Sequence, residues 1–178
     1  MHLTFDDGNR SDVTDAMPML LRLGRRASFF LLSAFIGRPD FVTRDDVAQL
    51  HAAGMAIGSH GADHVRWTTL GNAELVEQIS RSIQTLATLT REPINSVAVP
   101  FGAYDRRVLD VLRQLNIATV FTSDGGPARP GAWIKGRTTV RMDTPLEAIE
   151  ALLSDRLSVQ QRLQFLARSW KRRLRSGF

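Results

Sequence analysis

Two adjacent carboxylates, Asp6 and Asp7, stand near the start of the chain in the stretch LTFDDG, after a short apolar run and before a glycine. Like charges this close resist joint ionisation unless a cation lies beside them. Neighbouring side chains on a strand point to opposite faces, but both reach one cleft where the backbone turns at the strand's end. The pair therefore indicates a cation site or a proton-transfer site. The simpler alternative, in which Asp caps the next helix, explains one of the two residues.

Two histidines, His60 and His64, stand four residues apart in GSHGADHVRW, and the chain contains only four histidines. On a helical turn this spacing places both imidazoles on one side, within reach of one metal ion. With one carboxylate they form a three-ligand set of the kind that catalytic Zn²⁺ uses, leaving a position for water. Metal binding lowers the pKa of that water towards ~7, and the spare carboxylate then accepts its proton. The alternative is a solvated loop with two incidental histidines.

Three segments, LTFDDG, IGSHGADH and VPFGAYD, occur in this order and closely resemble three motifs of the polysaccharide deacetylase family. These are the carbohydrate esterases of family 4 type that share the NodB-homology domain. The resemblance extends from the first residues to about residue 142. It implies a distorted, incomplete (β/α)7 barrel with the site at the top. It also implies a metal-dependent hydrolase, most simply with Zn²⁺, which removes the acetyl group from an N-acetylated sugar or polysaccharide by water attack on the amide.

The resemblance assigns roles to individual residues of the motifs. It implies that Asp6 is the general base and that Asp7, His60 and His64 bind the metal. It implies that the backbone N–H of Phe101 helps to hold the oxyanion. Further residues at or near the motifs are expected to contact the substrate, and these are Trp67, Gly102, Tyr104, Asp124 and Arg137.

Three positions depart from the family pattern. The family usually has an Arg two residues before the Pro of PFG, where this chain has Ala98, so the tuning of Asp6 must come from elsewhere or be weaker. Many members have a late His as general acid, whereas this chain has none after His64. Either Asp6 makes both proton transfers, or Asp124 contributes, or turnover is poor. The residue after the first motif histidine is Gly61 in place of Ser or Thr.

The motifs need strands and helices to position them, and the apolar pattern alternates between the two. We expect strands at 2–5, 27–32, 55–59, 96–99, 117–122 and 138–142, and helices at 12–23, 43–54, 72–89, 105–116 and 144–153. This alternation predicts an α/β fold with a largely parallel sheet or barrel. In such folds ligands gather beyond the carboxyl ends of the strands, where the motif residues fall.

The composition is that of one globular domain. A chain of 178 residues is long enough for one domain with a hydrophobic core and too short for two, and 43% hydrophobic and 23% charged residues are ordinary for a globular protein. No apolar run approaches the ~20 residues of a membrane span, and acidic residues at positions 6 and 7 are unlike a signal peptide. The absence of cysteine excludes disulfides and thiolate chemistry. The sequence as it stands predicts a cytoplasmic protein, or an exported or membrane-surface protein if the N-terminus is incomplete.

The positive charge is concentrated at the C-terminus. Residues 155–178 contain seven Lys or Arg and one Asp, which leaves 16 basic and 17 acidic residues in the rest of the chain. We therefore expect a deacetylase domain over 1–154 and a basic amphipathic C-terminal helix or tail over 155–178. Such a helix suits an anionic membrane surface, through residues 156–175, or it packs on the barrel. Nucleic-acid binding is not expected, because the rest of the chain does not extend the positive surface.

Two other functions compete with the hydrolase. The first is a catalytically weak or inactive relative that binds glycans, which Ala98 and the missing late histidine favour and the retained acids and histidines oppose. The second is a deacylase or amidohydrolase of a non-carbohydrate amide, because one scaffold supports several chemistries through its loops.

Overall fold

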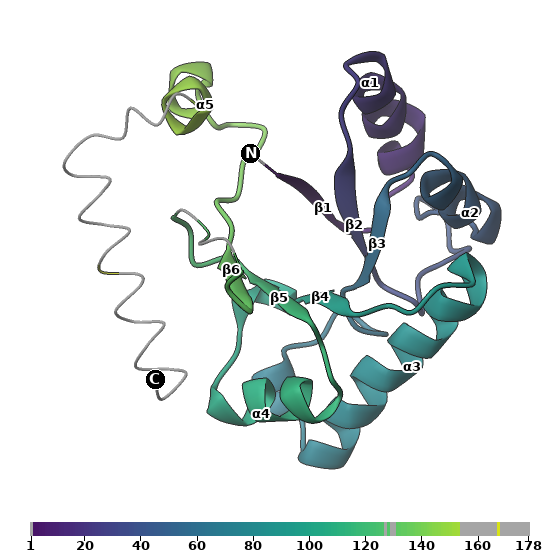
Figure 1. Cartoon of the computed structure of the whole chain (residues 1–178), viewed down its shortest axis with the longest axis vertical. Helices are drawn as coiled ribbons and strands as arrows, with labels where there is room; N and C mark the ends of the chain where they lie inside the picture. Colours follow the sequence, from purple (N-terminus) through teal and green to yellow (C-terminus); the bar gives the residue numbers. More distant parts are fainter. Residues whose placement is uncertain (1, 127, 129–130, 154–166, 168–178) are drawn as a thin grey trace.

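The computed structural model describes residues 2–126, 128, 131–153 and 167. In this part of the chain six parallel strands form one sheet in chain order: β1 (Leu3–Asp7), β2 (Ala27–Leu31), β3 (Ala56–Ser59), β4 (Ser96–Ala98), β5 (Thr119–Thr122) and β6 (Ile134–Gly136). The sheet curls into an incomplete barrel (Figure 1). Its two ends approach each other, since Arg137 beyond β6 donates a hydrogen bond to Thr4 of β1 at 2.9 Å. The predicted α/β class with a parallel, incomplete barrel is confirmed.

Helices follow the strands and cover the outside of the sheet. The α-helices are α1 (Met17–Arg22), α2 (Arg44–Ala52), α3 (Asn72–Thr90), α4 (Arg106–Gln114) and α5 (Leu146–Leu153). Figure 1 shows α1 to α4 on the convex side of the sheet and α5 apart from them, near the start of the chain. Of the helices that the structure describes, none has the length and apolar character needed to cross a membrane.

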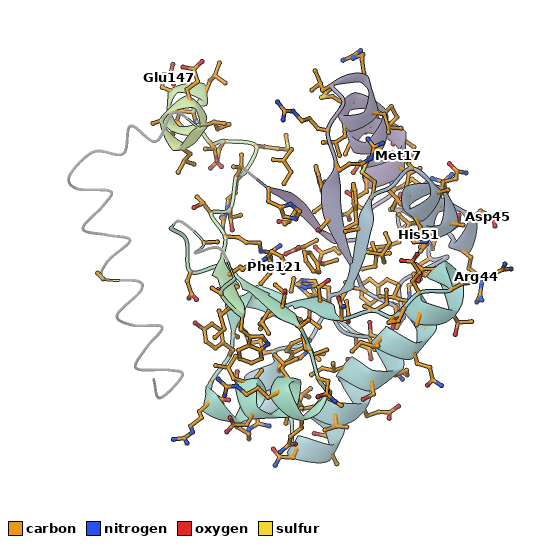
Figure 2. The ribbon with its side chains drawn as sticks, viewed as in Figure 1. Met17, Arg44, Asp45, His51, Phe121 and Glu147 are labelled. Atoms are coloured by element: carbon orange, nitrogen blue, oxygen red, sulfur yellow. The ribbon has the colours of Figure 1, made fainter. Side chains whose placement is uncertain are left out.

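The core lies between the sheet and these helices, and the alternation of side chains on β2 explains its layers. All five residues of β2 are buried. Phe29 and Leu31 pack with residues of α2 and α3, whereas Phe30 points to the inside of the barrel and packs with Ala98 and Phe121. Figure 2 shows the apolar side chains gathered between sheet and helices, while Arg44 and Asp45 of α2 extend outward. The sheet therefore has a filled outer layer and a small aromatic cluster inside its curl.

Two of the predicted helices begin at a side-chain cap. The Thr43 hydroxyl accepts a hydrogen bond from the Asp46 N–H at 3.2 Å, and the Asp46 carboxylate accepts from the Thr43 N–H at 2.8 Å. The Asp105 carboxylate accepts from the Val108 N–H at 2.9 Å. Because these side chains satisfy N–H groups that have no partner inside the helix, they fix where α2 and α4 begin.

Two predicted elements differ from the structure. The strand predicted at 138–142 is wrong: the last strand among the described residues is β6, which pairs with β5 through Val120 and Ile134. Residues 138–142 alternate like a strand, but no described strand pairs with them. The side chain of Val140 is 53% exposed. The helix predicted at 12–23 is divided into a π-helix over Asp12–Ala16 and α1, and Pro18 lies at the start of α1, where its missing N–H does no harm.

The basic helix predicted over 155–178 lies outside the described residues, apart from residue 167. Its contact with a membrane surface and the domain division at residue 154 stay predictions.

Candidate metal centre

The two adjacent carboxylates are separated by a sharp turn at the end of β1. Asp7 has φ +77° and Gly8 has φ +79°, so the chain leaves the strand through two successive left-handed residues. A Cβ on Gly8 would lie only 3.0 Å from the Leu31 side chain, so both the positive φ and the tight contact favour glycine at this turn. Neither carboxylate caps the next helical element, whose N-cap is Ser11. The capping alternative is therefore wrong.

His60 follows β3 and is almost fully buried, with 3% exposure. Its Nδ1 lies 2.8 Å from the carbonyl oxygen of Ala98, which accepts the ring N–H. That bond directs Nε2, carrying the lone pair, towards Asp7 Oδ1 at 3.4 Å. Burial lowers the pKa of His60 below its ordinary value, so the ring is neutral at pH 7. His60 is thus prepared as a metal ligand by its buried position and its backbone partner.

His64 completes the set from a loop. Its Nε2 lies 3.7 Å from Asp7 Oδ1, and its ring centroid is 5.4 Å from that of His60. The segment from His60 to His64 contains no helical turn, so the spacing of four residues works through the path of a loop and not through a helix face. The donor atoms of Asp7, His60 and His64 all lie within 4.8 Å of one another. The predicted convergence of these three residues is confirmed.

The donor atoms fit a divalent metal ion. Asp7 Oδ1 is buried and has no hydrogen-bond partner among the described residues, although two imidazole nitrogens face it. A buried acceptor that faces the lone pair of His60 Nε2 is unfavourable without a cation between them. Zn²⁺ bonds of 2.0–2.1 Å in tetrahedral geometry place neighbouring ligand atoms about 3.3 Å apart. The observed separations of 3.4 and 3.7 Å are close to that value, so the side chains are arranged for coordination.

Asp6 has a different partner, Arg137. Two guanidinium nitrogens of Arg137 donate to the two carboxylate oxygens of Asp6 at 2.6 and 2.7 Å, and one also donates to Thr4. A bidentate pair of this kind is strong and fixes the plane of the carboxylate. Arg137 comes from beyond β6, so the curl of the sheet is needed to bring it to β1. The orientation of Asp6 therefore comes from elsewhere than position 98, and Arg137, expected to contact the substrate, is instead bound to Asp6.

Phe101 borders the metal centre. It follows β4 with φ +57°, and its ring stacks on His64 with 4.2 Å between centroids. None of the described residues accepts a hydrogen bond from its N–H, as expected of an oxyanion donor. The guanidinium of Arg66, which the sequence reasoning missed, lies 4.8 Å from the centroid of the same ring. The signal for Arg66 was its position two residues after His64.

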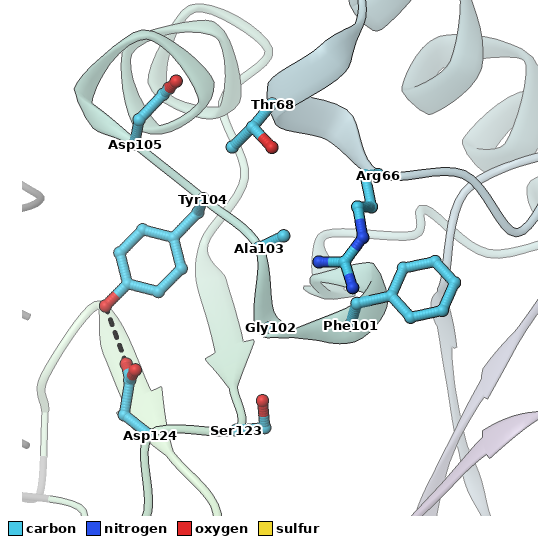
Figure 3. A pocket seen from close by; sticks show the side chains of 9 residues that line it. All are labelled: Arg66, Thr68, Phe101, Gly102, Ala103, Tyr104, Asp105, Ser123 and Asp124. Atoms are coloured by element: carbon cyan, nitrogen blue, oxygen red, sulfur yellow. Dashed lines mark hydrogen bonds between the residues drawn. The ribbon is translucent and has the colours of Figure 1, made fainter.

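A cavity of about 600 Å³ lies beside Phe101 (Figure 3). Gly102, Tyr104 and Asp124 line it, as expected for substrate contacts, together with Arg66. The Tyr104 hydroxyl donates to Asp124 Oδ2 at 2.7 Å, and the Thr122 hydroxyl donates to the same oxygen at 2.8 Å. A Cβ on Gly102 would lie 1.9 Å from Ser123 Oγ, so only glycine fits there. The cavity is therefore a preformed space with an oriented carboxylate.

The prediction that Trp67 contacts the substrate is wrong. Trp67 is fully buried and packs in the core with Leu75, Val108 and Leu109. Its indole lies beneath the loop of His60 and His64, where a Cβ on Gly61 would be 3.2 Å from Trp67 Nε1. The ring supports the loop from inside and has no exposed face for a ligand.

Asp12, the first residue of the π-helix, was missed as a titrating group. It is 5% exposed, and its Oδ2 has no hydrogen-bond partner among the described residues. Burial raises the pKa of Asp12 to about 7, and the charges of Asp7 and Asp6 add to this. The sequence pattern gave no sign of this, because an Asp at the start of a helix is usually exposed to solvent.

We expect the contribution of Asp12 to the stability of the metal-free protein to fall as the pH rises from about 4 to about 7, because folded Asp12 retains a proton that the unfolded chain releases. Buried His60, whose pKa is lowered, contributes in the opposite sense, so the Asp12 contribution is read from the difference between the parent and Asp12→Asn. The pKa difference corresponds to at most about 4 kcal/mol at pH 8. Asp12→Asn should remove most of this slope and be more stable than the parent above pH 7. Urea unfolding at pH 5 and pH 8 measures both, with the exposed Asp15→Asn as control. An unchanged slope in Asp12→Asn would contradict the buried carboxyl.

Comparison with known proteins identifies relatives of one kind. Residues 1–120 match the family model described as polysaccharide deacetylase. A chitooligosaccharide deacetylase of Azorhizobium caulinodans is 29% identical over 122 residues, covering 67% of this chain and 56% of that protein. A peptidoglycan-N-acetylglucosamine deacetylase, PgdA of Listeria monocytogenes, is 32% identical over 110 residues, covering 61% of this chain and 22% of that protein. The chain thus spans about half or less of the length of these relatives.

Solved structures show the same fold. The Streptococcus pyogenes deacetylase PplD has a TM-score of 0.78 at 20% identity, over 84% of this chain and 68% of that one. IcaB from Ammonifex degensii has a TM-score of 0.77 at 24% identity, over 84% of this chain and 71% of that one.

Proposed function

Because the chain belongs to the polysaccharide deacetylase family, we propose that it is a metal-dependent hydrolase that removes the N-acetyl group from a sugar unit of a glycan. The observation that carries the proposal is the convergence of Asp7, His60 and His64 around an unpartnered buried oxygen, with Asp6 next to it in the chain. The names of the relatives, which act on chitooligosaccharide and peptidoglycan, support a glycan of N-acetylglucosamine type.

We propose that Asp7, His60 and His64 hold Zn²⁺. Two imidazoles and one carboxylate are a usual protein ligand set for catalytic zinc. When bound there, the metal would polarise the amide carbonyl and would lower the pKa of water to ~7. The remaining chemistry belongs to the side chains and backbone groups around it.

Asp6 is the general base in this proposal. Two guanidinium N–H groups of Arg137 donate to its two carboxylate oxygens. The bidentate contact with Arg137 also fixes the orientation of the Asp6 carboxylate. The oxygen that accepts the proton is therefore already in position before the reaction. Asp6 takes a proton from the attacking water as the carbonyl carbon becomes tetrahedral.

The N–H of Phe101 stabilises the charge that develops on the carbonyl oxygen. The adjoining cavity holds the sugar, whose hydroxyls bond to the carboxylate of Asp124. The Tyr104 and Thr122 hydroxyls both donate to Oδ2 of that carboxylate and engage it as a hydrogen-bond acceptor. We therefore propose that Asp6 returns its proton to the departing amine, so that one carboxylate makes both transfers.

Metal analysis and acetate release test the function together. The purified protein should contain about one equivalent of zinc and release acetate from N-acetylglucosamine oligomers, and a chelator should abolish the release reversibly. Metal binding without acetate release from chitin oligomers or peptidoglycan would contradict the proposal and favour the glycan-binding relative.

Arg137→Met should lower kcat by about 10- to 100-fold, the range for a misplaced catalytic group, with little change in KM. Arg137→Lys, which keeps the charge without the fork, should lie between this variant and the parent. Steady-state kinetics and zinc content measure the effect, and Arg141→Met, an exposed arginine four residues on, is the matched control. A raised KM with unchanged kcat would restore the role in substrate binding that the sequence predicted for Arg137.

A further inference from the structure

The two imidazoles of the metal centre are held in different ways. The His60 ring donates to the Ala98 carbonyl and is buried by the strands around it. The His64 ring is 31% exposed, and among the described residues none forms a hydrogen bond with its Nδ1. Metal-binding histidines usually have such a partner, which orients the ring. The direction of His64 must therefore come from the stacked ring of Phe101 and from the backbone of its loop.

The backbone of the loop is bonded to two elements. On one side, the Ser33 and Ala34 N–H groups beyond β2 donate to the carbonyls of Gly61 and Ala62, at 3.2 and 3.0 Å. On the other side, the Ala62 N–H donates to the carbonyl of Gln78 in α3 at 3.1 Å. These bonds fix the first half of the loop, but they end one residue before Asp63.

Asp63, which directly precedes His64, is bound to α3 by a closed ring of hydrogen bonds. Its N–H donates to the Gln78 side-chain oxygen at 2.9 Å, and its carboxylate accepts from the Gln78 side-chain nitrogen at 2.8 Å. Arg81, one turn further along α3, donates to the same carboxylate oxygen at 2.7 Å. One residue is therefore held at both backbone and side chain by two positions on a helix of 19 residues.

We propose that Asp63 is a positioning residue that sets the metal affinity of the centre by fixing the loop at His64 to α3. The proposal rests on the metal-dependent function proposed above, but only on its metal and not on its substrate. An exposed ion pair by itself contributes little to stability. The three bonds to Gln78 and Arg81 hold Asp63, and the next residue, His64, has no hydrogen-bond partner of its own among the described residues. Loss of these bonds is therefore expected to weaken metal binding by His64.

The test compares zinc affinity with folding. Metal-free parent and Asp63→Ala are titrated with Zn²⁺ against a chromophoric chelator. Loss of a group bonded directly to a ligand typically weakens metal binding 10- to 100-fold. Because Asp63 acts on His64 through the loop, we expect the low end of that range, a Kd about tenfold higher in Asp63→Ala. At saturating Zn²⁺ the kcat should stay within about twofold of the parent, since no group that touches the substrate has changed.

The matched control is Asp110→Ala on α4, which removes an exposed aspartate paired with Arg113 at 3.1 Å, away from the centre. Its zinc Kd should equal that of the parent, whereas the thermal stability of both metal-free variants should fall by similar small amounts. Gln78→Ala should also raise the Kd, and in the double variant with Asp63→Ala the two effects should not add, because both remove the same ring.

If Asp63→Ala does not fold, Asp63→Asn replaces it, since Asn retains an oxygen for Gln78 and loses the charge paired with Arg81. Its Kd should rise about twofold to threefold, a fraction of the tenfold effect. The proposal is overturned if the zinc Kd of Asp63→Ala equals that of the parent. The same criterion applies to Asp63→Asn where that variant is used. Zinc binding by the parent without acetate release from glycans would overturn the deacetylase function and leave the role of Asp63 intact, so the two failures are distinguishable.

Discussion

Asp6→Asn is expected to lower kcat by about 10³-fold while the protein keeps its zinc, because general base catalysis contributes typically 10²–10⁴-fold. Asn has nearly the shape of Asp, and its oxygen still accepts a hydrogen bond from Arg137. It has no carboxylate to take the proton from water or to return it to the amine. The three donor atoms of the metal centre come from other residues, so metal binding has no reason to change.

Acetate release and zinc content of the same preparation measure this result. Asp45→Asn is the control, since Asp45 extends from the outside of α2 (Figure 2). Loss of zinc in Asp6→Asn would show that the roles of the two adjacent aspartates are reversed. A kcat within tenfold of the parent would exclude Asp6 as the base and return attention to Asp124.

His60→Ala is expected to weaken zinc binding by more than 10²-fold and to abolish acetate release. Loss of a residue that only hydrogen-bonds to a metal ligand already lowers metal affinity 10- to 100-fold, and His60 is itself a metal ligand. Its ring is buried and tied to the Ala98 carbonyl, so the loss of its nitrogen leaves two donors and a carbonyl without its partner. The same argument applies to His64→Ala, with less effect on folding because that side chain is partly exposed.

Zinc titration of the metal-free protein measures the change, with thermal unfolding as a check on folding. His51→Ala is the control: His51 lies on α2 (Figure 2), 3.7 Å from Glu92 and outside the metal centre. Unchanged zinc affinity in His60→Ala would disprove the proposed ligand set, because two donors cannot replace three.

The competing function, an inactive relative that binds glycans, loses part of its support. One reason for it was Ala98, which stands where the family usually has an arginine beside the base. The structure supplies that arginine from beyond β6, since Arg137 holds both oxygens of Asp6. The other reason, the missing late histidine, still applies, and the kinetics of Asp6→Asn and its parent address it.

The sequence by itself determined the parts of the protein that depend on neighbours in the chain. The ligands Asp7, His60 and His64 lie in short motifs at the carboxyl ends of strands, and parallel strands bring such ends to one edge of a sheet. The caps at Thr43 and Asp105 are equally local, because a side chain bonds N–H groups three residues away. These features could be predicted because their physical cause lies within a few residues.

Only the tertiary structure decided the partners that come from distant segments. Arg137 meets Asp6 across 131 residues because the sheet curls until β6 approaches β1, and no local pattern determines that curl. Residues 138–142 alternate like a strand, yet β5 pairs with 134–136. An alternating pattern does not determine which segment pairs with a given strand. Trp67 has a side chain suited to sugars, but the core beneath the loop buries it. Strand pairing and side-chain burial depend on which segments of the folded chain contact one another, so they cannot be predicted from a few neighbouring residues.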